Sequence, residues 1–435
     1  MEVISAISTA PGTGGVAIIR MSGEGCLDIA RKMFKPAGKT KVENFIPNMM
    51  YPGVIEGTGF TDFGMCVYFK APKSFTGEDI VELHCHGGIQ IARGILSKTV
   101  SLSARPAEKG EFTKRAFING KLSLSSAEGM IDMINAESLA SVRAGSMLYS
   151  EKLTSEIKLL QSEITLILAE ISADLDYPEE DLDNLNTPKI KREIIEISEK
   201  LKKLAASYSC GKKIKEGVTV AICGKPNTGK SSLLNAMLGY DKAIVSSEAG
   251  TTRDAVEGTL QIDGVKYNLT DTAGIRETSG EVESIGIARA EKIISSADIV
   301  ISVDDGRGEV NITKTSANII RVYNKCDISR PQCGYDAVIS ARTGEGIEQL
   351  KSLISQKSVG ELALDKAYII EERHHSALMR AVQALSSAQQ NADEYTPDIL
   401  SIDIKEAWDC LGEITGETAN EQIINTVFEK FCVGK

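Results

Sequence analysis

Residues 224–231 read GKPNTGKS, and this stretch decides the fold of the central part of the 435-residue chain. It fits the phosphate-binding loop G-x-x-x-x-G-K-[ST], in which backbone N–H groups and the start of a helix hold phosphate. The apolar run at 218–223 predicts a strand before the loop, and residues 232–238 are expected to continue as a helix. We expect Lys230 to reach the β- and γ-phosphates and Ser231 to offer its hydroxyl to Mg²⁺. Because strand, loop and helix coincide, the stretch predicts a P-loop domain rather than a chance glycine-rich turn.

Three further motifs follow the P-loop in the order of a GTP-binding domain. DTAG at 271–274 follows a predicted strand and places a carboxylate near the Mg²⁺ shell. NKCD at 324–327 supplies a carboxylate, Asp327, that can accept the N1–H and the exocyclic amine of guanine, a donor pair that adenine lacks. SAR at 340–342 offers the Ala341 N–H to the guanine carbonyl. NKCD alone is equally typical of a solvated turn, but the ordered set favours GTP over ATP.

The residue after DTAG is Ile275, where many GTPases have a glutamine that orients the attacking water. An isoleucine cannot do this, so another group is required. Glu277, Glu281 and Glu283 are acidic residues of the same segment, although each alone is also typical of a solvated loop. No arginine finger can be read from one chain, so the transition state needs another cation. Asn227, inside the P-loop, is an oxygen ligand suited to a monovalent ion.

Motifs outside these four give the chain a specific resemblance. AGTTRD at 249–254 and EVESIGI at 281–287 belong to the nucleotide domain, and GTTRD and NKCD occur in other GTPases. With the motifs outside that domain, the chain resembles the MnmE (TrmE) family of tRNA modification GTPases over about residues 1–435. Those outer motifs are PGTGGVAIIR at 11–20, SFTGEDIVELHCHGG at 74–88, RPAEKGEFTKRAFINGKL at 105–122, LGEITGE at 411–417 and the terminal FCVGK.

For the nucleotide site, the resemblance implies that Glu283 orients the water and that Ser231 and Thr252 hold Mg²⁺. It implies a K⁺ site made by the Asn227 side chain and by main-chain oxygens near Ser246, Glu248 and Thr251. The chain departs from the family pattern in two places. Glu248 stands where an apolar residue is expected, and the stretch 304–324 is short, so it leaves room for less helix than the family usually has there. The GTP-binding residues are then predicted to be Asn227, Thr228, Gly229, Lys230, Ser231, Ser232, Ser246, Ser247, Glu248, Ala249, Gly250, Thr251, Thr252, Asp271, Thr272, Ala273, Gly274, Asn324, Lys325, Asp327, Ser340, Ala341 and Arg342.

The resemblance also implies a folate site and a reactive cysteine. Arg20, Glu82, Lys121 and the terminal Lys435 match positions that the family uses for 5-formyl-tetrahydrofolate or methylene-tetrahydrofolate. A carboxylate suits a pterin edge and cations suit a glutamate tail, although alone these residues are typical of surface ion pairs. Cys432 in FCVGK matches a cysteine needed for the modification, whereas a lone cysteine is usually buried and inert.

Two smaller patterns are weaker evidence for a binding site. His84 and His86 alternate on a predicted strand and face the same way, but no further Cys/His cluster lies nearby, so zinc is disfavoured. PGTGG at 11–15 lacks the strand–helix–strand context of a dinucleotide site and is taken as a tight turn.

The function implied by the resemblance is K⁺-stimulated GTP hydrolysis in tRNA modification. Together with a flavoprotein partner of the MnmG (GidA) type, which carries FAD, the chain would add an aminomethyl-type (carboxymethylaminomethyl) group to C5 of the wobble uridine. The family also implies a homodimer within a hetero-oligomer. One alternative is an RNA-binding assembly GTPase of the Era or Der kind, which would need a basic RNA-binding appendage. Another is a folate-dependent one-carbon enzyme regulated by GTP.

Composition agrees with a multidomain globular protein. The content of 42% hydrophobic residues is enough to bury a core in each of two or three domains. The net charge of −11 argues against binding nucleic acid over the whole surface, so any tRNA contact is local or shared with a partner. Nine cysteines without a C-x-x-C pair are typical of reduced thiols. With no basic leader and no apolar run of 18 residues, we expect a cytoplasmic protein with no membrane contact.

The periodicity predicts four segments: an α+β domain at 1–118 that resembles a folate-binding and dimerisation domain, helical residues 119–213, a Ras-like GTPase domain at 214–357, and helical residues 358–435. The fold is expected to be multidomain α/β and α+β. Helical stripes alone do not show that the two helical segments pack together, but the family resemblance implies that the GTPase domain is inserted into one discontinuous helical domain. The apolar stripes with helical spacing are Leu153, Ile157, Leu160, Ile164, Ile167, Ile171 and Leu175; Ile190, Ile194, Ile197, Leu201 and Leu204; Leu378, Val382 and Leu385; and Ile423, Ile424, Val427 and Phe428.

Overall fold

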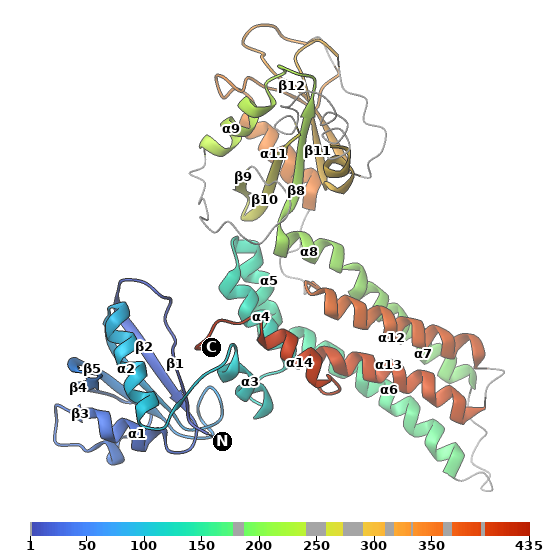
Figure 1. The fold of residues 1–435 in the computed structure, drawn as a ribbon. Helices are drawn as coiled ribbons and strands as arrows, with labels where there is room; N and C mark the ends of the chain where they lie inside the picture. The colour runs from blue at the N-terminus through green and yellow to red at the C-terminus, as the bar shows by residue number, and fades with distance from the viewer. Residues whose placement is uncertain are drawn as a thin grey trace, which may run out of the picture. The chain divides into compact units, whose positions relative to one another are not determined.

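The chain forms two units, each assembled from segments that are distant in the sequence. The structure is a computed structural model that describes residues 2–176, 187–240, 258–272, 290–308, 317–331, 334–359, 368–392 and 396–435. The first unit comprises Met1–Ile131, Met147–Ser198 and Arg380–Lys435, and the second comprises Asp132–Ser146 and Glu199–Met379. The predicted multidomain fold, with a P-loop domain between two helical segments, is confirmed (Figure 1). The predicted boundaries near 118, 213 and 357 stay predictions.

The first unit contains a seven-stranded sheet in the order β3-β4-β5-β6-β2-β1-β7. Helices α1 (Cys26–Met33) and α2 (Ile89–Ser101) pack on one face, against side chains such as Ile19 and Met21. Because side chains alternate along a strand, Arg20 and Ser22 of β2 point to the other face, called here the open face. The strands are β1 (Ile4–Ile7), β2 (Gly14–Ser22), β3 (Phe34–Pro36), β4 (Met50–Gly57), β5 (Phe60–Phe69), β6 (Ile80–Gly87) and β7 (Arg105–Pro106), with a short 3-10 helix η1 (Val42–Asn44).

The predicted helical stripes are confirmed, with one exception. On α6 (Lys152–Asp176) the residues from Leu153 to Ile171 of the stripe are buried, and α6 packs along α13 (Pro397–Thr415). Leu175 is 44% exposed because it lies in the last turn of α6. A proline at the first position of α13 suits a helix start, where its missing N–H costs nothing. The other helices are α3 (Glu111–Ile118), α4 (Leu124–Asn135), α5 (Leu139–Tyr149), α7 (Thr187–Ala206), α8 (Tyr208–Glu216), α12 (Glu372–Asn391) and α14 (Glu421–Phe428).

The second unit contains a six-stranded sheet in the order β13-β12-β11-β8-β10-β9. Every pair is parallel except β9–β10, so the strands before the nucleotide motifs end at the same edge. All six residues of β11 are buried, as expected for a strand covered on both faces. The elements are β8 (Val218–Gly224), α9 (Lys230–Tyr240), β9 (Gly258–Ile262), β10 (Val265–Asp271), β11 (Ile299–Asp304), β12 (Asn318–Tyr323), β13 (Ala337–Val338) and α11 (Ile347–Val359).

In the described ranges, no helix combines the length and the apolar character that a bilayer crossing requires.

Candidate nucleotide site and open face of the N-terminal sheet

The P-loop connects the end of β8 to the start of α9, as predicted. Gly229 has φ +92, and a Cβ at this position would lie 2.4 Å from the Asn324 side-chain nitrogen. Only glycine therefore allows this approach of the loop to the NKCD motif. Lys230 is buried, and its Nζ donates to the Lys225 carbonyl at 2.9 Å. The loop thus has the backbone shape and the buried lysine that phosphate binding requires.

Ser231, a predicted Mg²⁺ ligand, lies beside Asp271, the carboxylate expected near the Mg²⁺ shell, at the edge of the sheet. Ser231 at the start of α9 donates its hydroxyl to Asp271 Oδ2 at 2.7 Å, and Asp271 is 1% exposed. Thr272 is anchored beside them, because its N–H and its hydroxyl both donate to the Ile222 carbonyl, at 3.1 and 3.0 Å. A hydroxyl and a carboxylate in contact are hard oxygen ligands of the kind that Mg²⁺ prefers.

The predicted base-recognition motifs converge on the P-loop. Asn324 donates its amide to the Thr228 carbonyl at 2.9 Å, and Lys325 Nζ donates to the Asn227 carbonyl at 2.7 Å. The Ser340 hydroxyl donates to Asp327 Oδ1 at 2.6 Å and so orients the carboxylate predicted to bind guanine.

The Ala341 N–H donates to Asn324 Oδ1 at 3.0 Å in this structure. Its contact with the guanine carbonyl therefore stays a prediction. Arg342 and Ser232 are exposed. Several predicted site residues lie outside the described residues: Ser246, Ser247, Glu248, Ala249, Gly250, Thr251, Thr252, Ala273, Gly274 and Glu283, together with Ile275, Glu277 and Glu281.

On the open face, Arg20 and Glu82 are cross-strand neighbours on β2 and β6. Arg20 Nε donates to Glu82 Oε1 at 2.8 Å, and His84 Nε2 lies 3.1 Å from Glu82 Oε2. Burial alone would raise the pKa of Glu82, but its hydrogen bonds and the Arg20 charge lower it below 4.5, so the carboxylate stays ionised. The Arg20 guanidinium lies 5.7 Å from the ring centroids of Phe75 and Phe112.

Lys121 and the two histidines are held by further hydrogen bonds. Lys121 Nζ donates to the Pro72 carbonyl at 3.0 Å, in the loop that also carries Phe75. His86 Nδ1 lies 2.6 Å from Asp62 Oδ1, whereas His84 contacts Glu82. In the part of the chain that the structure describes, no group of three potential metal ligands occurs.

The C-terminal segment 432–435 lies against the N-terminal sheet. The Gly110 N–H donates to the Cys432 carbonyl at 3.4 Å, and Val433 forms an antiparallel bridge with Lys109. Gly434 has φ +101, and a Cβ there would lie 2.2 Å from the Ile7 carbonyl oxygen. The next residue towards the start of β1, Ala6, pairs with Arg20. Cys432 is exposed and Lys435 half-buried, so this segment reaches the strand that borders the Arg20–Glu82 pair.

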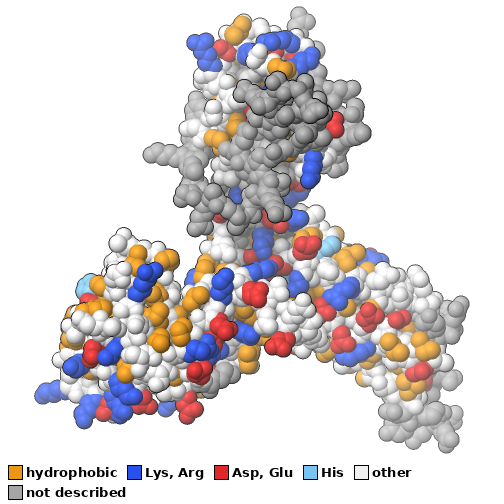
Figure 2. Space-filling view, viewed as in Figure 1, with side chains coloured by type: hydrophobic (Ala, Val, Ile, Leu, Met, Phe, Trp, Pro, Cys, Tyr) orange, Lys and Arg blue, Asp and Glu red, His pale blue; other side chains and the backbone are white. Residues whose placement is uncertain are grey.

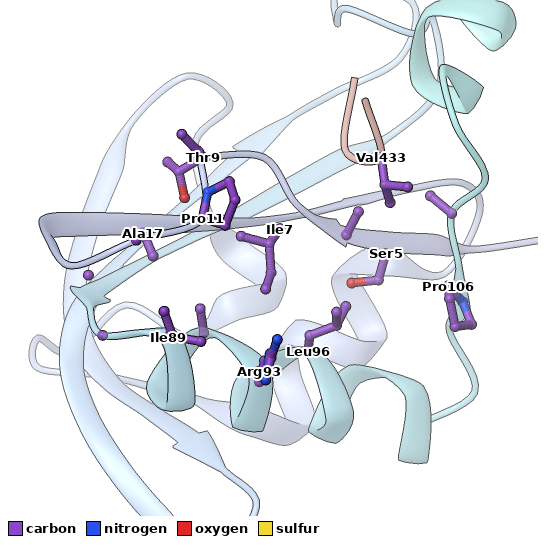
Figure 3. Close-up of a pocket in the computed structure, with 17 residues that line it drawn as sticks. Ser5, Ile7, Thr9, Pro11, Ala17, Ile89, Arg93, Leu96, Pro106 and Val433 are labelled. Atoms are coloured by element: carbon purple, nitrogen blue, oxygen red, sulfur yellow. The ribbon is translucent and has the colours of Figure 1, made fainter. Parts of the chain in front are cut away.

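The sequence reasoning missed two features of the first unit. The first is a pocket of about 330 Å³ on the α2 side of the sheet, lined mainly by apolar residues of β1, the following loop and α2 (Figure 3). Val433 of the C-terminal segment is one of its lining residues. The PGTGG turn forms part of its wall and was the only sequence signal.

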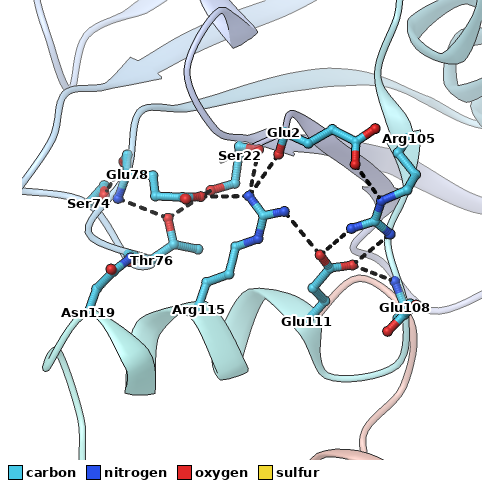
Figure 4. Close-up of polar contacts among 10 residues, drawn as sticks. All are labelled: Glu2, Ser22, Ser74, Thr76, Glu78, Arg105, Glu108, Glu111, Arg115 and Asn119. Atoms are coloured by element: carbon cyan, nitrogen blue, oxygen red, sulfur yellow. Dashed lines mark hydrogen bonds and ion pairs between the residues drawn. The ribbon is translucent and has the colours of Figure 1, made fainter.

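The second feature is a buried arginine network (Figure 4). Arg115 on α3 is 6% exposed and donates to Glu78 Oε2 at 2.9 Å, to Glu111 Oε1 at 3.0 Å and to the Glu2 carbonyl at 3.0 Å. Arg105 also contacts Glu111. No short motif signals this network, because its members come from distant parts of the sequence.

Comparisons with known proteins cover the whole chain. A family model described as "GTP-binding protein TrmE N-terminus" matches residues 3–121, and one described as "MnmE helical domain" matches 124–432. The tRNA modification GTPase MnmE of Thermoanaerobacter pseudethanolicus (strain ATCC 33223 / 39E) is 38% identical over 459 residues, covering 100% of this chain and 99% of that protein. The protein of that name from Clostridioides difficile (strain 630) is 35% identical, with the same coverage. Among solved structures, the G domain of the T. maritima FeoB iron transporter is 26% identical, covers 32% of this chain and 98% of its own, and has a TM-score of 0.26.

The P-loop, the Ser231–Asp271 contact and the convergence of NKCD with SAR define a P-loop protein of the GTP-hydrolysing class. The full-length matches make the assignment specific. The chain belongs to the MnmE family of tRNA modification GTPases, and its GTP hydrolysis serves tRNA modification.

Proposed function

We propose that this chain is a K⁺-stimulated GTP hydrolase that acts with a flavin-dependent partner of the MnmG (GidA) type. Together they would add an aminomethyl-type (carboxymethylaminomethyl) group to C5 of the tRNA wobble uridine. A tetrahydrofolate held on the open face would supply the one-carbon unit. The observation that carries the proposal is the position of segment 432–435 against β1, the strand next to the Arg20–Glu82 pair.

On the nucleotide side, Ser231, Asp271 and Thr252 are the groups proposed to surround Mg²⁺, and the contact of the first two supports a cation there. Asn227 is exposed at φ +64 and would offer its side-chain oxygen to K⁺. When bound, these cations supply positive charge to the developing negative charge on the phosphates. Glu283 is proposed to orient the attacking water.

On the modification side, the open face combines groups that fit a folate. Glu82 is ionised and can accept N–H bonds from a pterin edge, while the half-buried Phe75 provides an apolar wall next to Arg20. Lys121 and Lys435 would bind the carboxylates of the glutamate tail. Cys432, whose side chain is exposed, would act on the reacting base or on the one-carbon unit.

A homodimer through the open face is part of the proposal. Val16, Phe63 and Met65 are 58%, 58% and 39% exposed, and their strand positions place them on the Arg20–Glu82 face. Exposed apolar side chains gathered on one sheet face are typical of an association surface. We expect Met65→Glu to shift the chain from dimer to monomer in analytical ultracentrifugation. Ile89→Glu, which changes an exposed residue on α2, should leave the dimer intact.

The contact with tRNA is expected to be local. On the face in Figure 2, basic and acidic side chains of the described residues are interspersed, as the net charge of −11 suggests. A partner that carries part of the RNA-binding surface fits this distribution better than broad electrostatic binding by this chain alone.

The deciding experiment is mass spectrometry of tRNA nucleosides from cells that lack the chain, complemented with the wild type, Cys432→Ser or Cys210→Ser. We expect a C5-modified wobble uridine with the wild type and with Cys210→Ser, which changes a half-buried thiol of the second unit. It should be absent with Cys432→Ser. Rescue by all three would remove Cys432 from the chemistry, and unchanged nucleosides in the deletion would favour an Era- or Der-like assembly switch.

Two variants test the hydrolytic part separately. Asn227→Ala should abolish the difference in GTP turnover between KCl and NaCl, and a normal response to KCl would reject the K⁺ assignment. Glu283→Ala should lower turnover without weakening nucleotide binding.

A further inference from the structure

A buried carboxylate outside the sequence motifs contacts the NKCD lysine. Asp305, directly after β11, accepts a hydrogen bond from Lys325 Nζ at 2.6 Å, and its side chain is only 3% exposed. The same Nζ donates to the Asn227 carbonyl at 2.7 Å. Lys325 is therefore held between a carboxylate of the loop after β11 and the backbone of the P-loop.

This carboxylate is buried at a cost. Asp305 Oδ1 is buried and has no hydrogen-bond partner among the described residues. Burial alone would raise the pKa of Asp305, but the bond and charge of Lys325, with the charge of Arg307, lower it below 3.8. A buried charge with an unsatisfied oxygen normally destabilises a fold, so its presence next to a functional lysine requires a reason.

The backbone conformations on both sides of the contact indicate what it stabilises. Asn227 and Lys325 are non-glycine residues with φ +64 and +69, a region that costs energy for side chains with a Cβ. The hydrogen bond from Lys325 fixes the Asn227 carbonyl in this turn. The P-loop is tied to the same loop a second time, because Lys225 Nζ donates to the Arg307 carbonyl at 2.6 Å.

We propose that Asp305 is a positioning residue for guanine-nucleotide binding, which holds Lys325 against the Asn227 carbonyl and so fixes the P-loop turn that receives the phosphates. Asp305 does not itself touch the nucleotide. This positioning role is part of the GTP-binding function of the site, and it does not depend on K⁺, on folate or on the modification partner.

If Asp305 acted only through its charge, removing it would change the nucleotide affinity in the opposite direction. A negative charge near a phosphate site weakens the binding of anions, so removing it should tighten nucleotide binding. If Asp305 acts by positioning, removing it frees Lys325 to leave the P-loop carbonyl, and binding weakens because the turn is no longer pre-organised. The direction of the change in affinity therefore separates the two roles.

The experiment uses the full chain and a fluorescent GDP analogue, mant-GDP, whose affinity and dissociation rate are measured in the same buffer. Asp305→Ala should weaken binding about tenfold to a hundredfold, the effect of losing one hydrogen bond to a charged group. Asp305→Asn keeps the size and one acceptor oxygen and should show a smaller loss. Unchanged or tighter binding by Asp305→Ala would overturn the proposal.

Two controls distinguish positioning from damage to the loop. Arg307→Ala removes the other cation near Asp305 Oδ2, at 3.0 Å, but leaves the contact with Lys325, so it should change affinity by less than about twofold. In a Lys325→Met background, Asp305→Ala should have no further effect, because the group that it positions is gone. Equal losses from Arg307→Ala and Asp305→Ala, or additive losses in the double variant, would show that the loop is merely structural. Far-UV circular dichroism confirms folding of each variant.

Discussion

Asp132 on α4 is predicted to make the stability of the second unit depend on pH. Its side chain is 12% exposed, and Lys215 Nζ lies 2.8 Å from its Oδ1. Lys215 also contacts Glu371, whose side chain is 9% exposed, so one ammonium serves two buried carboxylates. Burial and then the charge of Glu371 raise the pKa of Asp132 to about 7, although Lys215 opposes this. Asp132→Asn mimics the protonated form.

The direction of this pH dependence follows from the number of protons that the folded and unfolded states bind. Unfolded Asp132 titrates near 3.8, so between about pH 4 and 7 the folded state keeps a proton that the unfolded state has released. The free energy of unfolding therefore falls as the pH rises through this window. Roughly three pH units at about 1.36 kcal/mol each set an upper limit of about 4 kcal/mol on the fall in the free energy of unfolding. The actual fall is smaller, because Lys215 can pair with whichever of the two carboxylates is ionised.

Hydrogen exchange measured by mass spectrometry on peptides of α8, which carries Lys215, reports this local stability. After correction for intrinsic exchange, wild-type protection should decrease from pH 5 to pH 8, and Asp132→Asn should show a flat profile with greater protection at pH 8. Glu137→Gln is the matched control, since this carboxylate is 57% exposed and pairs with Lys266. Equal slopes in the wild type and Asp132→Asn would refute the reasoning.

Three further predictions concern the first unit. Arg115→Ala leaves Glu78 without its cation and Glu111 with Arg105 alone, and it should lower the local unfolding free energy of the sheet by about 3–5 kcal/mol in hydrogen exchange, whereas the more exposed Arg105→Ala should lower it by less. Ile164→Ala should cost about 2–5 kcal/mol in the denaturation of α6 followed by Trp408 fluorescence, whereas Leu166→Ala, 72% exposed, should change it by less than about 0.5 kcal/mol. Gly434→Ala should displace segment 432–435 and abolish tRNA modification with GTP turnover intact, whereas Gly120→Ala, with φ +67 and open space, should retain modification.

The parts of the molecule that could be predicted from sequence are those encoded over short distances. The P-loop and the α6 stripe each lie within one contiguous segment, so spacing alone identified them. The Arg20–Glu82 pair could be assigned to folate only through the family resemblance, because an isolated arginine and glutamate carry no spacing signal. Asp305 and Asp132 went unnoticed because their properties arise from burial and from partners distant in the sequence.

The position of Cys432 depends more on the aromatic cluster before it than on the terminal contacts. The C-terminal segment itself is held by a bridge at Val433, a 3.4 Å hydrogen bond from Gly110 to the Cys432 carbonyl and the close approach of Gly434 to the Ile7 carbonyl. Before this segment, Phe428 and Phe431 are buried, and the ring centroids of Phe428 and of Phe117 on α3 lie 6.1 Å apart.

Helix α3 is in turn tied to the sheet by Arg115, whose contacts reach Glu78 and the Glu2 carbonyl. The thiol is therefore held relative to the open face through α14, α3 and the arginine network. A buried aromatic side chain contributes several times more than an exposed ion pair. It follows that truncating Phe431 should release Cys432 from the sheet, whereas neutralising Lys435 should affect ligand binding alone.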